Sequence, residues 1–315
     1  MPPDAPCPST SRRRRVPSDG PFFIGLFVLA GIYVALILAF TGADVLYLFR
    51  YDSTTDGAAG GWRTLRTTLA SPEIAGSIVL TLVTCSISAI LSLFVAVPAG
   101  YLLSRVRFPG RRLADALLDI PILLPPLVVG LSLLILFNQI PLFEQTLEQW
   151  SAAAFSWLTV INPDLRPGVT FKVPAVILAQ FSVAAAFAIR TMQTAFDEIH
   201  SRQEAVALTL GCNRAGAFWH VLLPQARRGI LTAATLAWAR ALGEFGPILV
   251  FAGATRGRTE VLSTSVFLEI NIGNLRGAVA VSLLMILLAL ALIAAVRIAG
   301  IPRDLETTGR RAGYA

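Results

Sequence analysis

Long apolar runs divide the chain into candidate membrane spans, because a helix needs about 20 such residues to cross roughly 30 Å of hydrocarbon. Four runs of this length contain no charged residue, and two more are interrupted only by Arg190 or by Arg240 and Glu244. The pattern therefore predicts an all-α, polytopic membrane protein with six transmembrane helices, at about 21–43, 74–104, 113–137, 173–196, 229–253 and 277–297.

Basic residues in the connecting segments predict the orientation of these helices, because positive charge is retained on the cytoplasmic side. Sixteen arginines lie in the two tails and in the connections after the second and fourth predicted helices, whereas the alternate connections hold eight basic residues. We therefore expect a multi-pass protein of the plasma (inner) membrane with both termini in the cytoplasm. The segment 201–224 is expected on the same side.

Composition agrees with a protein embedded in lipid. Hydrophobic residues make up 55% of the 315 residues and charged residues only 14%, with a mean hydropathy of +0.68. The net charge of +7 follows from the topology, so no nucleic-acid partner is expected. Cys7, Cys85 and Cys212 are far apart in the sequence, which gives no support to a disulfide framework or a metal or redox motif.

The predicted spans leave tails and two long external connections. Residues 1–20 are rich in Pro, Ser and Arg and are expected to be a disordered cytoplasmic tail, and 299–315 a second one. The basic run before residues 21–43 resembles a secretory signal, but the apolar run is too long and lacks a convincing cleavage site, so an uncleaved helix is favoured. The connections are Asp44–Glu73 and Asn138–Lys172; the second carries aromatic residues that fit an interfacial belt or a docking surface, namely Phe143, Trp150, Phe155 and Trp157.

The stretch "RQEAVALTLGCNRAGAFWHVLLP" (202–224) lies between two apolar segments but is too polar to cross a membrane. Ser201 followed by Glu204 predicts a capping box at a helix start, and Gly211 predicts a left-handed turn at the helix end. A second helix is expected until Pro224 stops it. Its apolar residues, Phe218, Trp219, Val221 and Leu222, are expected to anchor it to the bundle. An ordinary interfacial loop is the alternative.

This stretch resembles the EAA loop of ABC importer permeases, the coupling helix that sits in a cleft of the ATPase subunit. In that family a Glu and small residues precede a Gly, and a Leu-Pro follows about a dozen residues later. The matching positions here are Glu204, Ala205, Ala207, Gly211, Leu223 and Pro224, while Val206 departs from the usual Ala. Two further segments, "DIPILLPPLVVGLSLLILF" (119–137) and "TLAWARALGEFGPILVFAGATRGRTEVL" (235–262), look like those of molybdate permeases, with sulfate and tungstate permeases close behind.

The resemblance covers roughly residues 71–298 and implies a type I ABC importer permease. It implies a homodimer that binds two cytoplasmic ATPases at the segment from Ser201 to Pro224 and receives a tetrahedral oxyanion from an external binding protein. Molybdate is the first expectation, and sulfate and tungstate are the alternatives. The motif G-x-x-x-x-G-K-[ST] is absent from the sequence, so ATP is expected to be used by the partner subunit. No cofactor, metal or catalytic residue is expected in this chain.

Several residues inside the predicted spans are candidates for the pathway or its gate. Arg240 and Glu244 are four residues apart and therefore on one helical face; a structural or gating pair is favoured over an anion site, because a bare carboxylate would repel a dianion. Glycines permit close helix packing, and prolines break a helix where it lines a cavity or is covered by neighbours. These candidates are Gly243, Gly246, Pro125 and Pro126.

Other function classes fit the sequence less well. The two histidines, His200 and His220, lie in the cytoplasmic connection, and neither H-E-x-x-H nor G-x-S-x-G occurs, which argues against an intramembrane hydrolase. A secondary transporter or channel would share the spans but would have no need of a coupling segment. A secondary transporter or channel is therefore the more distant alternative.

Overall fold

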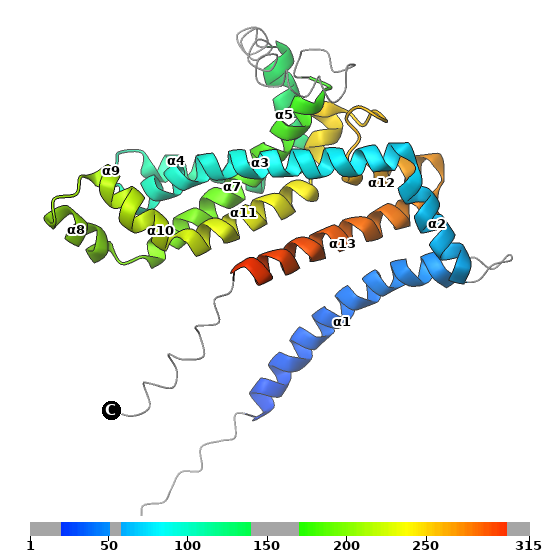
Figure 1. Cartoon of the computed structure of the whole chain (residues 1–315), viewed down its shortest axis with the longest axis horizontal. Coiled ribbons are helices and arrows are strands. Elements are labelled where there is room, and N and C mark those ends of the chain that lie inside the picture. The colour runs from blue at the N-terminus through cyan, green and yellow to red at the C-terminus, as the bar shows by residue number, and fades with distance from the viewer. Residues whose placement is uncertain (1–19, 51–57, 140–169, 301–315) are drawn as a thin grey trace, which may run out of the picture.

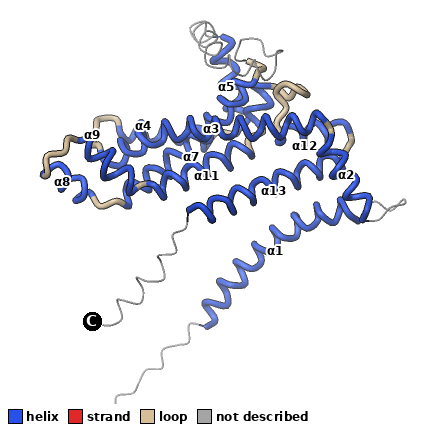
Figure 2. The backbone as a smooth tube through the Cα atoms, in the orientation of Figure 1, coloured by secondary structure: helices blue, strands red, loops and turns tan. Residues whose placement is uncertain are grey.

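The computed structural model describes residues 20–50, 58–139 and 170–300, and every regular element in those ranges is helical (Figures 1 and 2). The elements are α1 Gly20–Arg50, α2 Ala58–Ala70, α3 Pro72–Arg105, α4 Arg111–Leu123, α5 Pro126–Gln139, α7 Val173–Glu198, α8 Ser201–Thr209, α9 Arg214–Ala217, the π-helix η2 Phe218–Leu222, α10 Leu223–Gln225, α11 Arg227–Leu242, the π-helix η3 Ile248–Ala252, α12 Leu262–Ile272 and α13 Leu275–Gly300.

Four of the predicted spans are continuous helices long and apolar enough to cross a membrane. They are Phe22–Phe49, Pro72–Arg105, Val173–Glu198 and Leu275–Val296. The first extends beyond the predicted 21–43, so α1 reaches Arg50. The predicted external connection that follows it holds the helix α2.

The third predicted span is not one straight helix. α4 and α5 meet at an angle of 110°, and together they count as one broken span. Pro126 begins α5, and Leu124 has the extended conformation (φ −71°, ψ 142°) that a following proline imposes on the residue before it. The predicted span 113–137 is therefore two helices, because two consecutive prolines end α4 and redirect the chain, as the prolines in this run predicted.

The fifth predicted span, 229–253, is also interrupted. α11 ends at Leu242 and η3 starts at Ile248, with Gly243–Pro247 between them. α11 has only 16 residues, fewer than a membrane crossing needs. The described residues thus contain four continuous candidate spans, or five with the bent pair, whereas the sequence predicted six helices.

The core of the bundle lies between α3, α7 and α11, which run side by side in Figure 1. Small residues let these helices approach closely, as expected where lipid provides no hydrophobic drive for helices to associate. A Cβ atom at Gly100 of α3 would lie 2.8 Å from Met192 Cβ of α7. A buried hydroxyl ties the same helices, since Ser88 Oγ donates to the Ile177 carbonyl at 3.0 Å.

α8 and α9 lie at one end of this bundle and α2 and α12 at the other (Figure 1). α1 begins and α13 ends toward the α8 end. The predicted tails 1–20 and 299–315 fall almost wholly outside the described residues. The same is true of the aromatic residues expected between Asn138 and Lys172, which are Phe143, Trp150, Phe155 and Trp157.

Candidate functional site

The helix α8 begins at Ser201, but the predicted capping box is absent. His200 is the N-cap residue, and no side chain caps the helix. Ser201 is the first helical residue, one position too late to act as a cap. The Glu204 carboxylate instead accepts a hydrogen bond from the Tyr101 hydroxyl of α3 at 2.9 Å. Glu204 therefore ties α8 to a membrane span, a contact that spacing along the sequence does not reveal.

Gly211 ends this helix as predicted. Its φ of +93° lies in the left-handed region that glycine adopts without strain. The Cys212 amide donates to the Ala207 carbonyl and the Gly211 amide to the Leu208 carbonyl, both at 3.1 Å, which is the Schellman pattern. The turn is then secured by Asn213, whose Oδ1 accepts from the Gly216 amide at 2.6 Å.

Pro224 does not stop the second helix, so that prediction is wrong. α9, η2, α10 and α11 follow one another closely from Arg214 to Leu242. In the π-helix η2 the Leu223 amide donates to the Phe218 carbonyl, five residues earlier. The wider π turn shifts the pattern of backbone hydrogen bonds in the helix at the point where Pro224 has no amide hydrogen to donate.

The two faces of this segment differ. Phe218 packs against Tyr101, with ring centroids 4.9 Å apart, and Leu222 is fully buried, so these two anchors are confirmed. Trp219 is 62% exposed, so its predicted anchoring role is wrong. With Val206 at 56% and Leu210 at 80% exposure, it presents apolar surface at the end of the bundle.

The remaining coupling candidates are divided between surface and core. Ser201, Ala205, Gly211 and Pro224 are exposed, Leu223 is half-buried and Ala207 is buried. The small residues at Ala205 and Gly211 therefore leave the outer surface of α8 accessible to another protein, whereas Ala207 packs inward.

The junction between α7 and α8 is held by α3. The Arg105 guanidinium donates to the Phe196 carbonyl at 2.8 Å and also to the Ile199 carbonyl. Ser104 Oγ donates to the Asp197 carboxylate at 2.5 Å. A cation that satisfies the last carbonyls of a helix is favoured there. The sequence marked Arg105 only as one of many cytoplasmic arginines.

The two helix breaks pack directly against each other. A Cβ atom at Gly246 would lie 2.9 Å from Pro126 Cβ, and one at Gly130 would lie 2.7 Å from Pro247 Cα. The structure therefore brings Pro125, Pro126 and Gly246 together, as candidates for one place in the pathway. Gly243 does not share this packing, because a Cβ there would meet only its own helix at 3.8 Å; its predicted close-packing role is wrong.

Arg240 and Glu244 form the ion pair that their spacing predicted. Glu244 lies just past the end of α11 and is only 1% exposed. Its backbone carbonyl accepts from the Ser263 hydroxyl of α12 at 2.7 Å, and the Arg240 guanidinium lies over the Phe187 ring of α7 at 5.6 Å. The pair thus joins three elements beside the break; its gating role stays a prediction.

A second arginine, Arg190 of α7, holds the first half of the broken span. Its guanidinium makes a two-pronged contact with the Asp119 carboxylate, at 2.5 and 2.6 Å, and reaches the Asp115 carboxylate at 2.6 Å. Two parallel N–H to oxygen bonds fix orientation as well as distance. Sequence reasoning missed this cluster; the signal was an arginine in one predicted span and two aspartates four residues apart in another.

Comparisons with known proteins agree with this architecture. Residues 96–300 match the family described as binding-protein-dependent transport system inner membrane component. The chain is 31% identical over 274 residues, 87% of its own length and 92% of the relative's, to the "Molybdenum transport system permease protein ModB" of Mycobacterium tuberculosis. It is 30% identical over 210 residues, 66% of this chain and 70% of the relative, to the "Sulfate transport system permease protein CysT" of Salmonella typhimurium.

Among solved structures, the fold is similar to a chain of a bacterial ABC transporter involved in the import of the acidic polysaccharide alginate. The TM-score is 0.66 at 15% sequence identity, covering 89% of this chain and 96% of that one. This likeness shows the fold of a type I ABC importer permease. With two thirds of its length matched, the chain belongs to the family of binding-protein-dependent transport system inner membrane components.

Proposed function

We propose that this permease subunit forms the translocation pathway of an ATP-driven importer for a tetrahedral oxyanion, with molybdate as its substrate. Relatives named for molybdenum and for sulfate transport support an oxyanion. The relative named for molybdenum is 31% identical over 87% of the chain, whereas two relatives named for sulfate are 24% and 29% identical over 86% and 85% of it, and we therefore put molybdate before sulfate. Tungstate, which has the same shape and charge as molybdate, is the third candidate.

The coupling segment carries this proposal. α8 presents exposed Val206 and Leu210 at the end of the bundle, and contiguous exposed apolar surface of this kind marks an interaction site. We assign this surface to a separate ATPase subunit in the cytoplasm. Glu204 and Phe218 connect the segment to Tyr101 of α3, so a displacement of α8 by the ATPase reaches a membrane span directly.

The pathway is assigned to the packed helix breaks between α4 and α5 and between α11 and η3. Non-helical backbone at membrane depth is tolerated where protein buries it or where it lines a cavity. Two copies of the chain would enclose the pathway, and an external binding protein would deliver the anion to the α12 end. In this assignment both termini and α8 are cytoplasmic, in line with the arginine-rich connections.

Reconstitution tests the proposal directly. The permease, the ATPase and the binding protein encoded beside it are placed in liposomes, and uptake of molybdate is measured with ATP inside the compartment that faces α8. We expect ATP-dependent uptake that survives an uncoupler and is reduced by excess tungstate more than by excess sulfate. Uptake driven by an ion gradient without ATP would establish a secondary transporter instead.

A further inference from the structure

Glu260, in the loop before α12, is a buried carboxylate without a hydrogen-bond partner among the described residues. The residue is 2% exposed. The Ser265 hydroxyl lies close to it but donates to the Val261 carbonyl at 3.1 Å. An ionised carboxylate that has lost its water and gained no donor is costly, and such groups take up a proton instead.

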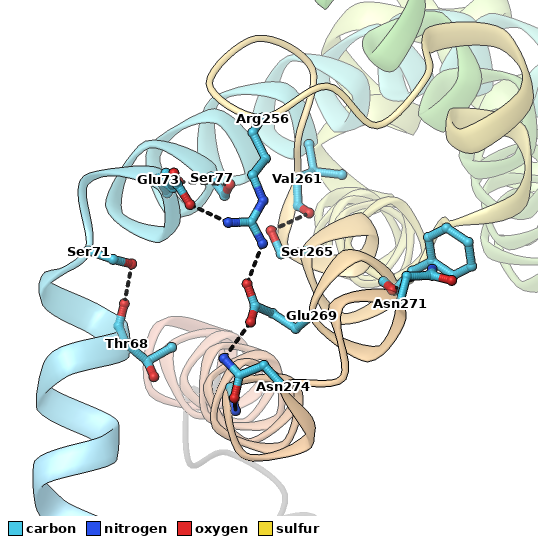
Figure 3. A network of polar contacts seen from close by, with 12 residues as sticks. Thr68, Ser71, Glu73, Ser77, Arg256, Val261, Ser265, Glu269, Asn271 and Asn274 are labelled. Atoms are coloured by element: carbon cyan, nitrogen blue, oxygen red, sulfur yellow. Dashed lines mark hydrogen bonds and ion pairs between the residues drawn. The ribbon is translucent and has the colours of Figure 1, made fainter.

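The charged groups that act on Glu260 are Arg256, Glu73 and Glu269, and Figure 3 shows how these three residues contact one another. Arg256, in the same loop, forms ion pairs with Glu73 at the start of α3 and, at 2.6 Å, with Glu269 of α12. Asn274 Nδ2 donates to the other oxygen of Glu269 at 2.6 Å. The guanidinium is therefore already shared by two carboxylates, and little of its charge remains to compensate a third.

Burial raises the pKa of Glu260 above its ordinary value of 4.5; Arg256 opposes this effect, while Glu73 and Glu269 add to it. The cluster borders a cavity of about 360 Å³, which is lined by Glu73, Arg256 and Glu269 among others. Glu260 is buried and is not among the lining residues of this cavity, whereas the ion pairs of Arg256 beside it join the ends of two helices.

We propose that Glu260 is a proton-binding site, neutral while Arg256 holds α3 and α12 together and ionised when this end of the molecule opens to water. Opening then releases one proton. The contribution of this carboxyl to the closed arrangement is complete below pH 4.5, where it is neutral in both states, falls as the pH rises above 4.5, and levels off once the pH passes the raised pKa of the closed state. One proton changes the opening equilibrium by at most about tenfold per pH unit.

Only the biological consequence of this inference rests on the proposed function. If the α12 end is external, the pH outside the cell sets how readily the permease opens toward the binding protein. The proton site itself does not depend on transport or orientation. It is therefore tested with equal pH on both faces of the membrane, while the uptake assay described above tests the transport function separately.

Cysteine labelling measures the opening. In a full chain whose three native cysteines are replaced by serine, Ser77→Cys places a thiol at a buried position of α3 near the cluster. Ile270→Cys, at an exposed position of α12 that is not among the residues lining this cavity, corrects for the pH dependence of the thiol reaction. We expect the ratio of the two maleimide labelling rates in liposomes to rise as the pH increases from 4.5, by at most about tenfold per pH unit.

The variant Glu260→Gln, which resembles the protonated carboxyl, should make this ratio low and independent of pH. Glu198→Gln is the control variant. It removes an exposed carboxylate at the C-terminal end of α7, next to α8, and should leave the rise unchanged. A flat ratio in the parent chain, or an unchanged rise in Glu260→Gln, would overturn the proposal. If Glu260→Gln does not assemble, the same measurement is made on Glu260→Ala, in which the ratio should again be independent of pH, and an unchanged rise there overturns the proposal.

Discussion

At Gly211, a single backbone angle decides where the coupling helix ends. Its φ of +93° is unfavourable for a residue with a Cβ atom, by about 1–2 kcal/mol, and most of all for a β-branched one. A Cβ at this position would have nothing within 4 Å, so space inside the chain is not limiting. The effect of a side chain on the backbone conformation at this position can therefore be tested separately from its effect on the approach of a partner protein.

We predict that Gly211→Val weakens co-purification of the ATPase and lowers coupled ATP hydrolysis, while membrane insertion is retained. Gly211→Asn is the matched control, because asparagine tolerates the left-handed region but adds comparable bulk. If only the turn conformation matters, the Asn variant should still bind the ATPase. If the ATPase approaches the glycine closely, the Asn variant should lose ATPase binding as the Val variant does. Normal binding and coupling in the Val variant would remove this segment from the coupling site.

The Arg240–Glu244 pair gives a second prediction at this scale. Arg240→Ala leaves a fully buried carboxylate without its cation, a change that costs roughly 3–5 kcal/mol in comparable buried pairs. The double variant Arg240→Ala/Glu244→Gln removes the stranded charge and should recover much of the assembled protein, as measured by its thermal unfolding midpoint in detergent. Additive losses would contradict a direct energetic pairing. Retained assembly with an altered anion preference would assign Arg240 to the substrate.

At the level of elements, Arg190 decides whether α4 stays with the bundle after the chain bends. α4 has no fully buried residue, and its Leu118 only partly packs against the core, so its attachment to α7 relies mainly on the polar contacts to Asp115 and Asp119. We predict that Arg190→Ala lowers both the unfolding midpoint and the uptake rate. Arg190→Lys should recover only part of the loss, because an ammonium cannot make the two parallel bonds of a guanidinium.

A comparison with Thr194→Ala provides the control, since Thr194 lies on the same helix and its hydroxyl bonds only to the Arg190 carbonyl at 3.1 Å. That variant should behave like the parent chain. If Arg190→Ala also behaves like the parent, α4 is held by other means and the cluster is not the attachment point of the broken span.

For the whole molecule, the prediction concerns sidedness. Gln203 and Ile272 are exposed at opposite ends of the bundle, so a cysteine at each reports one face of the membrane. In intact cells an impermeant maleimide should label Ile272→Cys at once and Gln203→Cys only after permeabilisation. Labelling of Gln203→Cys from outside would reverse the orientation and place α8 away from any cytoplasmic ATPase.

The sequence by itself determined the class of protein, because the length of each apolar run and the charge content can be read without knowing which residues are in contact. Four spans, the left-handed Gly211 and the Arg240–Glu244 pair each follow from residues at most four positions apart or from one uninterrupted run. The resemblance of 201–224 and its flanking segments to ABC permeases identified the family. Local rules of this kind are readable from one chain.

Tertiary structure decided everything that depends on a partner from a distant segment. Glu204 was predicted to cap its own helix, but Tyr101 lies 103 positions away in sequence and takes its carboxylate. The prolines predicted a break in 113–137, but nothing in the sequence predicted the break in 229–253 or the contact between the two breaks, in which Pro126 and Pro247 pack against glycines of the opposite segment. Inside a bilayer a buried polar or broken element persists only if a neighbour satisfies it, and which neighbour does so is a property of the fold.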